Sequence, residues 1–229
     1  MRLWAIVPVK PFSKGKSRLS DLLSPDQRTL LNSTLLSRTI RTLRMVQEIQ
    51  QIIVVSRDSS ALSIARSFGV KTIQEDAAID LNKALKRAVA VTRAYTANAI
   101  LVVPSDLPLL EPSNVTDMLS LSDGETKTQV IIAPDRRKTG TNALYLSPPG
   151  VIDFKFGENS FNLHIEEARS KQIKVSVYEN ANLGLDIDLP QDLEILSKTH
   201  QTTLLEELML DDLFEVPHDA QITREEDCI

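Results

Sequence analysis

The sequence predicts an α/β fold with a mostly parallel sheet, and two observations lead to this prediction. Short apolar runs rich in β-branched residues alternate with longer amphipathic runs along most of the 229 residues. The runs at 3–9 and 99–103 are almost continuously apolar, which is typical of central strands covered on both faces. Together they indicate a sheet sandwiched between layers of helices.

The expected elements follow in order along the chain. Apolar, β-branched runs predict strands at 3–9, 51–56, 70–74, 99–103, 129–133, 143–147 and 173–178. Amphipathic periodicity predicts helices at 24–46, 59–67, 77–95, 112–121, 160–171 and 190–198. Ligands in such sheets bind beyond the carboxyl ends of the strands, so the polar residues that follow each strand are the first candidates for a functional site.

Composition excludes several classes of function. Aromatic residues make up only 4% of the chain, which disfavours single-stranded nucleic-acid binding by base stacking. The single cysteine, Cys228, excludes a disulfide framework and a thiolate metal cluster. No apolar run reaches the length of a membrane span. We therefore expect a cytoplasmic protein that acts on small molecules, with neither a nucleic acid nor a membrane as partner.

Charge divides the chain into two parts. Residues 201–229 contain nine acidic residues and one basic residue, whereas residues 1–200 contain 22 acidic and 25 basic residues. The mildly basic part is the expected catalytic domain, followed by an acidic helix and tail. Within the tail, residues 204–214 have apolar residues at helical spacing. We expect this helix to dock on its own domain, with a partner-binding or oligomerisation helix as the alternative, and a homodimer is left open.

A loop with four cations follows the first expected strand. Lys10, Lys14, Lys16 and Arg18 could line an anion site, with Gly15 giving access to the backbone. The glycine spacings of a P-loop and of a dinucleotide-binding turn are both absent. The loop therefore indicates phosphate binding by lysine and arginine side chains, with an ordinary solvated loop as the alternative.

Three aspartates are candidate metal ligands. Asp106 follows the fourth expected strand between Pro104 and Pro108, which stiffen the turn. Asp186 and Asp188 alternate in an extended segment, so their side chains point the same way and repel each other unless a cation or strong donors lie between them. A set of carboxylate oxygens alone suits Mg²⁺.

Two further stretches favour contact with a small molecule. Residues 133–143 are polar and basic and lead into a strand. Residues 156–164 lead into a helix whose N-terminus could accept an anion, with Ser160 as the expected N-cap and Gly157 leaving the backbone accessible. An ordinary loop and an ordinary cap explain each stretch equally well when taken alone. Asp192 begins the next helix and is expected to favour the helix dipole rather than to bind metal.

Five motifs occur together in a fixed order. They are Pro8-Val-Lys-Pro-Phe-Ser-Lys-Gly-Lys-Ser-Arg-Leu, Pro104-Ser-Asp-Leu-Pro, Ala133-Pro-Asp-Arg with Gly140-Thr-Asn-Ala, Phe156-Gly-Glu-Asn-Ser-Phe, and Leu185-Asp-Ile-Asp-Leu-Pro-Gln-Asp-Leu-Glu. Each motif is weak alone. In register over residues 1–200, the set resembles the phospholactate and phosphoenolpyruvate guanylyltransferases of coenzyme F-420 biosynthesis.

The resemblance implies a nucleotide-diphospho-sugar-transferase-like fold, which is a Rossmann-like three-layer α/β sandwich. It also implies an activity: transfer of GMP from GTP to the phosphate of phosphoenolpyruvate or 2-phospho-L-lactate, with release of pyrophosphate. The implied cofactor is Mg²⁺, and the implied partners are GTP and a phosphorylated three-carbon acid.

The resemblance further implies a role for each candidate residue. The metal ligands would be Asp106, Asp186 and Asp188, and the contacts to the acid would be Thr141, Gly157 and Ser160. The nucleotide contacts would be Lys16, Arg18 and Asn82, to which the charge of the loop adds Lys10. The catalytic residues would be Lys16, Arg18 and Asp106. Asp80 stands where the family's Gly-Leu-Asn element usually has glycine, which weakens the assignment of Asn82.

Two alternatives to this function stay open. Another nucleotidyltransferase of the same fold would use a sugar phosphate or the pterin cofactor molybdopterin as acceptor. A non-catalytic nucleotide-binding or scaffold protein would work through the acidic tail, although three intact aspartates argue against it. The choice between phosphoenolpyruvate and 2-phospho-L-lactate depends on the shape of the pocket, which the sequence does not determine.

Overall fold

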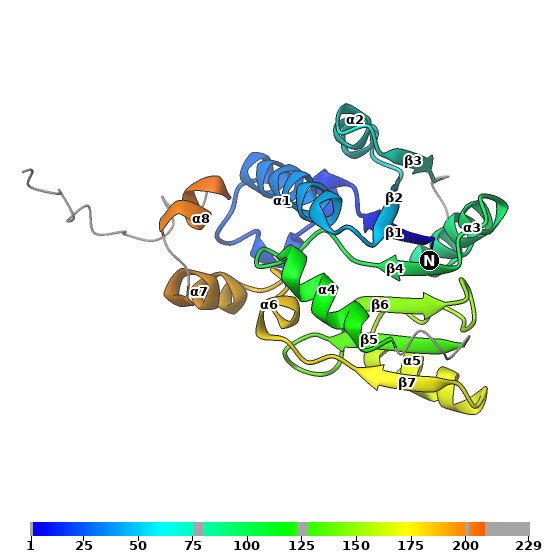
Figure 1. Ribbon diagram of the computed structural model, residues 1–229. Coiled ribbons are helices and arrows are strands. Elements are labelled where there is room, and N and C mark those ends of the chain that lie inside the picture. Colours follow the sequence, from blue (N-terminus) through cyan, green and yellow to red (C-terminus); the bar gives the residue numbers. More distant parts are fainter. Residues whose placement is uncertain (1, 76–79, 123–127, 200–201, 209–229) are drawn as a thin grey trace, which may run out of the picture.

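The computed structural model describes residues 2–75, 80–122, 128–199 and 202–208. They fold around a seven-stranded sheet with the strand order β3-β2-β1-β4-β6-β5-β7 (Figure 1). Neighbouring strands are parallel, except that β6 runs antiparallel to β4 and β5. The strands are β1 (Leu3–Val9), β2 (Ile49–Ser56), β3 (Lys71–Gln74), β4 (Ala99–Val102), β5 (Gln129–Pro134), β6 (Thr141–Ser147) and β7 (Lys174–Val177). The predicted mostly parallel sheet is confirmed.

Helices cover both faces of the sheet, as the sequence predicts (Figure 1). On one face, α1 (Pro25–Met45), α2 (Ser59–Ser67) and α4 (Pro112–Ser120) share a buried apolar cluster with the strands. On the other face, α3 (Leu81–Ala94) and α5 (Ser160–Ser170) share a second cluster. The three-layer sandwich is therefore present.

The central strand β1 is buried on both faces, which explains its unbroken apolar sequence. Ala5 and Val7 belong to the cluster beneath α1, whereas Trp4 and Ile6 belong to the cluster beneath α3. None of the four is more than 4% exposed. Large side chains buried to this degree each contribute roughly 1.5–3 kcal/mol of transfer free energy, so β1 is a rigid base for the loop that follows it.

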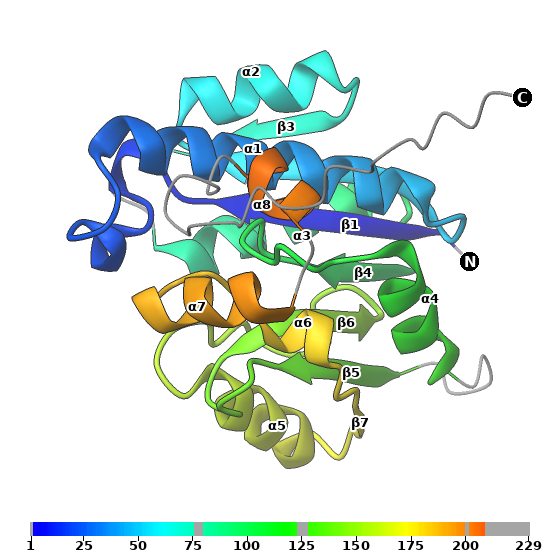
Figure 2. The ribbon, with the colours of Figure 1, turned by 90° about the vertical axis from the view of Figure 1, so that its left-hand side faces the viewer.

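A third apolar cluster attaches the C-terminal helices, α7 (Pro190–Thr199) and α8 (Thr202–Glu207), to the body of the molecule (Figure 2). Leu193 of α7 is 0% exposed, and Leu205 of α8 is 3% exposed. The other buried members come from these two helices, α1, the loop after β1, the turn after β4 and the segment before α7, so this cluster holds the site-bearing segments together.

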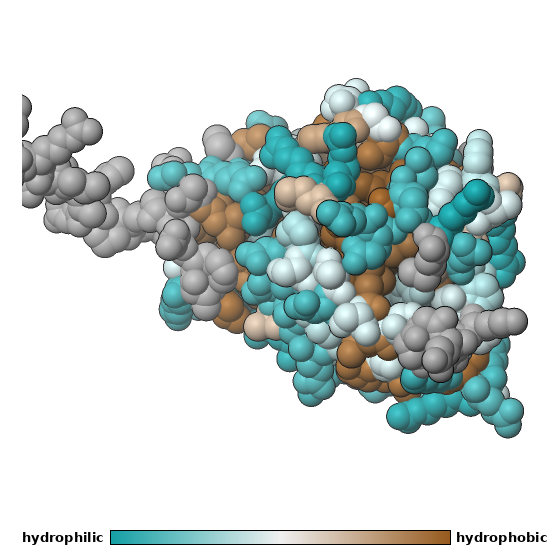
Figure 3. Space-filling model, viewed as in Figure 1, coloured by the Kyte–Doolittle hydropathy of each residue, from teal (hydrophilic) through white to brown (hydrophobic). Residues whose placement is uncertain are grey.

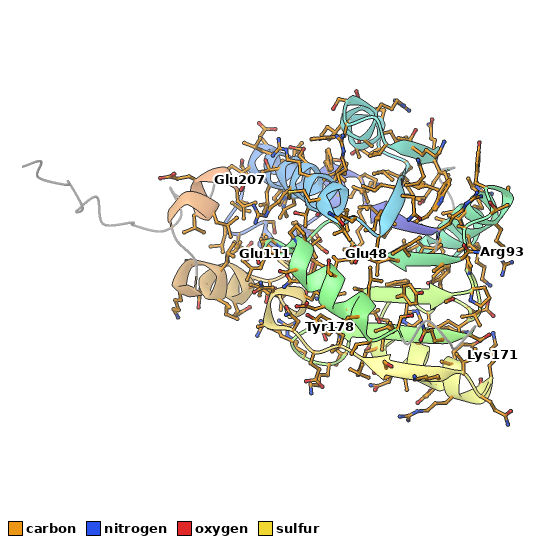
Figure 4. All side chains as sticks on the ribbon, viewed as in Figure 1. Glu48, Arg93, Glu111, Lys171, Tyr178 and Glu207 are labelled. Atoms are coloured by element: carbon orange, nitrogen blue, oxygen red, sulfur yellow. The ribbon has the colours of Figure 1, made fainter. Side chains whose placement is uncertain are left out.

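An ion pair adds to the attachment of α8. Glu207 lies beside α1 (Figure 4), and its Oε2 is 2.8 Å from Nη1 of Arg38. The beginning of the expected 204–214 helix therefore docks on its own chain, as predicted. Residues from 209 onward lie outside the described residues, and the division into a domain and a tail stays a prediction.

Three local features differ from the expected elements. Helix α3 begins at Leu81, after an N-cap in which the Asp80 side chain accepts a hydrogen bond from the backbone N–H of Asn82 at 3.0 Å. A single helical turn, α6 (Ala181–Gly184), precedes the paired aspartates. Two short 3₁₀ turns order the cationic loop. Hydrophobic periodicity cannot detect elements of three or four residues, which explains why the short turns were missed.

Polar and charged side chains cover much of the face in Figure 3, with hydrophobic side chains visible between them. The most exposed large hydrophobic residues, Met45 and Tyr95, belong to different elements. Among the described residues, no helix combines the length and the apolar character that crossing a membrane requires.

Candidate functional site

The candidate site lies at the carboxyl edge of the sheet. The parallel strands β1, β2 and β4 end there, and β6 begins there because it runs antiparallel to β4. A cavity of about 620 Å³ opens at this edge, within the range typical of small-molecule sites. Eight of the ten predicted site residues line it: Lys10, Lys16, Asp106, Thr141, Gly157, Ser160, Asp186 and Asp188.

The cationic loop after β1 is anchored at Phe12. This residue is 3% exposed, its backbone N–H donates to Oδ2 of Asp58 at 2.7 Å, and its carbonyl accepts from Nδ2 of Asn32 at 3.1 Å. Asn32 also lies against Gly15, where a Cβ would come within 2.6 Å of the Asn32 Nδ2 atom. The loop therefore passes this close to α1 because position 15 is glycine.

Two cations of the loop are paired with predicted metal ligands. The Lys16 side chain is 6% exposed, and its Nζ lies 2.9 Å from Oδ2 of Asp106. A buried ammonium group requires such a partner. The Arg18 side chain is 65% exposed, and its Nη1 lies 2.6 Å from Oδ2 of Asp188. Both members of the first pair line the cavity, whereas only Asp188 of the second does, and the second pair is solvated and weak.

Asp186 and Asp106 are close enough for the charge of one to affect the pKa of the other. Burial, and then the charge of Asp106, raises the pKa of Asp186 to about 6, against the opposing effects of Asn142 and Lys16. The Asn142 Nδ2 atom lies 3.4 Å from Oδ1 of Asp186. The backbone N–H of Ile187 donates to the Asp106 carbonyl at 3.0 Å, which fixes the segment of the paired aspartates against the turn after β4. A cation placed here would relieve the repulsion.

Asp192 supports the segment that carries Asp188. Its buried Oδ2 accepts from the backbone N–H of Asp188 at 2.9 Å and of Leu189 at 2.6 Å, and its Oδ1 lies 2.6 Å from Nη2 of Arg136. Burial alone would raise the pKa of Asp192, but the Arg136 and backbone hydrogen bonds hold this pKa below its usual value. Asp192 therefore serves the start of α7, as expected.

The chemistry of the three aspartates fits a hard cation, although they are not gathered around one point. Within the described ranges, no group of three or more His, Cys, Asp or Glu side chains is close enough together to hold a metal ion. Asp106 and Asp188 contact cationic side chains instead. Carboxylate oxygens are the ligands that Mg²⁺ prefers, so the donor set suits this ion. The metal assignment stays a prediction.

Thr141, Gly157 and Ser160 form a polar corner of the cavity, which we call the acceptor corner. Thr141 begins β6 and Ser160 begins α5, and both are buried. Gly157 has φ = 135°, a value that other residues rarely adopt. The predicted N-cap at Ser160 is wrong by one residue, because the chain enters α5 through a left-handed turn at Asn159, which is the N-cap. The corner lies at a helix N-terminus, which favours an anion.

His164 lies behind the acceptor corner and was not predicted to belong to the site. Its Nδ1 is 3.1 Å from Oγ1 of Thr141, and its Nε2 accepts from the backbone N–H of Lys155 at 2.9 Å. The residue is 0% exposed, and burial lowers the pKa of the imidazole to about 4. The only signal in the sequence is its spacing of four residues from Ser160, which places both on one face of α5.

Asn82 and Arg18 are the predicted residues that do not line the cavity. The Asn82 Nδ2 donates to the Phe156 carbonyl at 3.0 Å, and its Oδ1 accepts from the Phe156 N–H at 2.8 Å. This two-way clamp ties the start of α3 to the segment that leads into Gly157. Asn82 therefore supports the acceptor corner, and its contact with a nucleotide stays a prediction.

Two charged residues after the outer strands also line the cavity and were not predicted. Arg57 follows β2, and Glu75 follows β3. Burial raises the pKa of Glu75, against the charges of Arg57 and Arg87. Their position directly after a strand is the only signal in the sequence.

The amino-acid sequence is similar to those of named enzymes. The family model described as "Guanylyl transferase CofC like" matches residues 3–221. The chain is 38% identical over 193 residues to the phosphoenolpyruvate guanylyltransferase of Rubrobacter xylanophilus, covering 84% of this chain and 92% of that protein. It is 36% identical over 193 residues to the 2-phospho-L-lactate guanylyltransferase of Methanothermobacter thermautotrophicus, covering 84% and 83%.

Solved structures share the fold at much lower identity. A protein from Desulfovibrio desulfuricans G20, assigned to the nucleotide-diphospho-sugar transferases, aligns with a TM-score of 0.73 at 16% identity, covering 93% of this chain and 96% of that chain. A nucleotidyl transferase from Methanothermobacter aligns with a TM-score of 0.63 at 17% identity, covering 86% and 97%. These similarities confirm the predicted fold class.

Proposed function

The chain belongs to the CofC-like guanylyl transferase family, and on this basis we propose that it transfers GMP from GTP to the phosphate of phosphoenolpyruvate or 2-phospho-L-lactate in coenzyme F-420 biosynthesis. The observation that supports this proposal best is the content of one cavity. It joins a cationic loop, three aspartates and a polar corner at a helix N-terminus. These are the groups that two phosphorylated substrates require.

The reaction needs no general base. The acceptor phosphate is ionised near neutral pH, and one of its oxygens attacks the α-phosphorus of GTP. The bond from the α-phosphorus to the oxygen that bridges to the β-phosphate breaks, and its electron pair leaves with pyrophosphate. The task of the protein is to hold two anions together and to offset their charge.

The cationic loop would hold the triphosphate. Lys10, Lys14 and Lys16 line the cavity, and Arg18 lies on the same loop. Lys16 would stabilise the charge that develops on the departing pyrophosphate. Lys16 is already paired with Asp106. When the nucleotide binds, a phosphate would either take the place of this carboxylate or bind the Lys16 ammonium group together with it.

The acceptor corner would hold the three-carbon acid. The hydroxyl groups of Thr141 and Ser160 can donate to its carboxylate, and the N-terminus of α5 favours its negative charge. The positive φ of Gly157 turns the backbone at this point without a side chain that would fill the corner.

The proposed metal site is inferred from the carboxylate oxygens of the three aspartates. Mg²⁺ bound by Asp106, Asp186 and Asp188 would supply positive charge at the transferred phosphoryl group. The raised pKa of Asp186 supports this assignment: burial is its main cause and the charge of Asp106 its second, and a bound cation would offset both effects.

The test is pyrophosphate release from the purified protein with Mg²⁺ and GTP. Phosphoenolpyruvate and 2-phospho-L-lactate are added in separate reactions, and ATP and CTP replace GTP as controls. We expect release that requires GTP and one of the acids, with the guanylylated acid identified by mass spectrometry. GTP binding without release for either acid would point to a different acceptor or to a non-catalytic protein.

A pair of variants connects this activity to the cavity. Asp106→Asn is expected to lower turnover on the order of 10²-fold or more, because it removes a carboxylate that would bind the metal and that pairs with Lys16. Asp153→Asn is the matched control, since Asp153 also pairs with a lysine, Lys86 at 2.8 Å, but is exposed and does not line the cavity. Equal turnover in the two variants would place the chemistry elsewhere.

A further inference from the structure

We propose that His164 is a positioning residue that directs the hydroxyl proton of Thr141 into the cavity, where this proton binds the anionic acceptor. The inference rests on the proposed function, because it assumes that the acid binds at the acceptor corner. It assigns a role to a buried histidine that would otherwise count as part of the core.

The backbone around the ring determines which nitrogen carries the proton. The Lys155 N–H is 2.9 Å from Nε2, and a backbone N–H can only donate, so Nε2 must be the unprotonated acceptor. The pKa of about 4 keeps the buried ring neutral above pH 5, so the single proton is on Nδ1.

This tautomer determines the direction of the Thr141 hydroxyl. Nδ1 lies 3.1 Å from the Thr141 Oγ1, and its lone pair is taken up by the N–H bond, so Thr141 cannot donate to His164. Within the described part of the chain, His164 is the only hydrogen-bond partner of this hydroxyl group. The hydroxyl proton is therefore left for a ligand in the cavity that Thr141 lines.

The ring itself is held in place by its neighbours. The ring of Phe156 meets that of His164 edge to face at 71°, with 4.9 Å between the centroids. The backbone of Phe156 is in turn clamped by Asn82. One continuous set of contacts therefore runs from Asn82 through Phe156 and His164 to Thr141, and a hydroxyl held in this way loses little rotational freedom when it binds an anion.

Two substitutions separate the two hydrogen bonds of the ring. In His164→Asn, the amide occupies the place of Nδ1 and can still donate to Thr141. In His164→Gln, the longer side chain reaches the place of Nε2 and can accept from Lys155, but it leaves no donor beside Thr141. Both variants remove the ring, so a general packing defect affects both.

The measured quantities are kcat and the separate KM values for GTP and for the acid that the wild type uses. We expect His164→Gln to raise the acid KM about tenfold or more, because a hydrogen bond to an anion is lost or misdirected, while the GTP KM changes little. His164→Asn is expected to stay within about threefold of the wild type. Leu163→Ala, at an exposed position of α5, is the control for changes in that helix.

A double variant tests whether His164 acts through Thr141. Thr141→Val removes the hydroxyl group and should raise the acid KM by itself. Adding His164→Gln to Thr141→Val should then cost nothing further. Additive effects, or equal effects of Asn and Gln at position 164, would overturn the proposal and leave the histidine a packing role. Absence of GMP transfer in the wild type would instead refute the proposed function.

Discussion

The backbone N–H of Ile187 donates to the backbone carbonyl of Asp106 at 3.0 Å. This bond joins the turn after β4 to the extended segment before α7, and so brings Asp186 and Asp188 to the turn that carries Asp106. Because the bond uses backbone atoms, it leaves the three carboxylates free to exchange partners. The frame of the site can stay constant while Lys16 and Arg18 give way to a cation or a phosphate.

Asp188→Asn should lower turnover in GMP transfer by orders of magnitude while the fold survives. The Asp188 side chain is 38% exposed and its Arg18 partner 65%, so loss of the charge costs little stability. Its expected importance lies in binding the metal beside the reacting phosphates. Steady-state turnover and the thermal midpoint are measured on the same preparations, with Asp153→Asn as control. Turnover near that of the wild type would remove Asp188 from the metal site.

Asp192→Ala should destabilise the protein by about 2 kcal/mol, because it leaves two part-buried backbone N–H groups before α7 without acceptors and leaves Arg136 without its partner. The Asp192 side chain is 3% exposed and accepts from two backbone N–H groups and from Arg136. Asp192→Asn retains one acceptor oxygen and should lose less. Urea unfolding at pH 7 measures both. An Asp192→Ala variant as stable as the wild type would show that Asp192 does not support this segment.

The sequence predicts the framework of the site better than its contacts. Polar residues at strand ends converge because parallel strands end at one edge, and this rule correctly brought Lys16 and Asp106 together. The same rule does not reveal that β6 runs antiparallel, which is what places Thr141 at this edge. The direction of β6 depends on the connection from β5, whose residues are polar and give no signal for direction. Hydrophobic periodicity shows which face of a strand is buried, but it does not show which way the strand runs.

The contacts that were missed depend on atomic positions far apart in the sequence. Asn82 resembled a nucleotide ligand from its motif, yet its amide is paired with the backbone of Phe156. His164 has no motif at all, and its link to Thr141 forms only once α5 packs against the sheet. Hydrogen bonds of this kind follow from tertiary packing, so a pattern of residue types does not determine them.

The contribution of His164 to stability should fall as the pH is lowered from about 6.5 to 4. Burial lowers the pKa of His164 from 6.5 to about 4, so within this window the unfolded chain binds more protons than the folded one. The stability that the neutral ring contributes is fully present above the unfolded pKa and is lost below pH 4, a change of about 3 kcal/mol.

Comparison with His164→Asn isolates this contribution. Asp186 has a raised pKa and contributes the opposite slope between about pH 4 and 6, so the wild type alone is not informative. The difference in unfolding free energy between the two proteins is measured by urea titration at pH 7, 5.5 and 4.5. We expect the difference to shrink as the pH falls. Parallel curves for the two proteins would show that the imidazole is protonated as easily in the folded state as in the unfolded chain.

Gly157→Ala should raise the KM of the acid more than that of GTP. A Cβ at Gly157 would meet no atom within 4 Å, so the cost comes from the backbone, whose φ of 135° strains an alanine by about 1–3 kcal/mol. The backbone at position 157 would relieve this strain by changing its direction, which would displace the acceptor corner. Gly69→Ala is the matched control, since Gly69 also has a positive φ, 71°, and open space around it, but does not line the cavity. Both variants should lose some thermal stability, and only Gly157→Ala should weaken use of the acid. An unchanged acid KM in Gly157→Ala would separate this turn from acceptor binding.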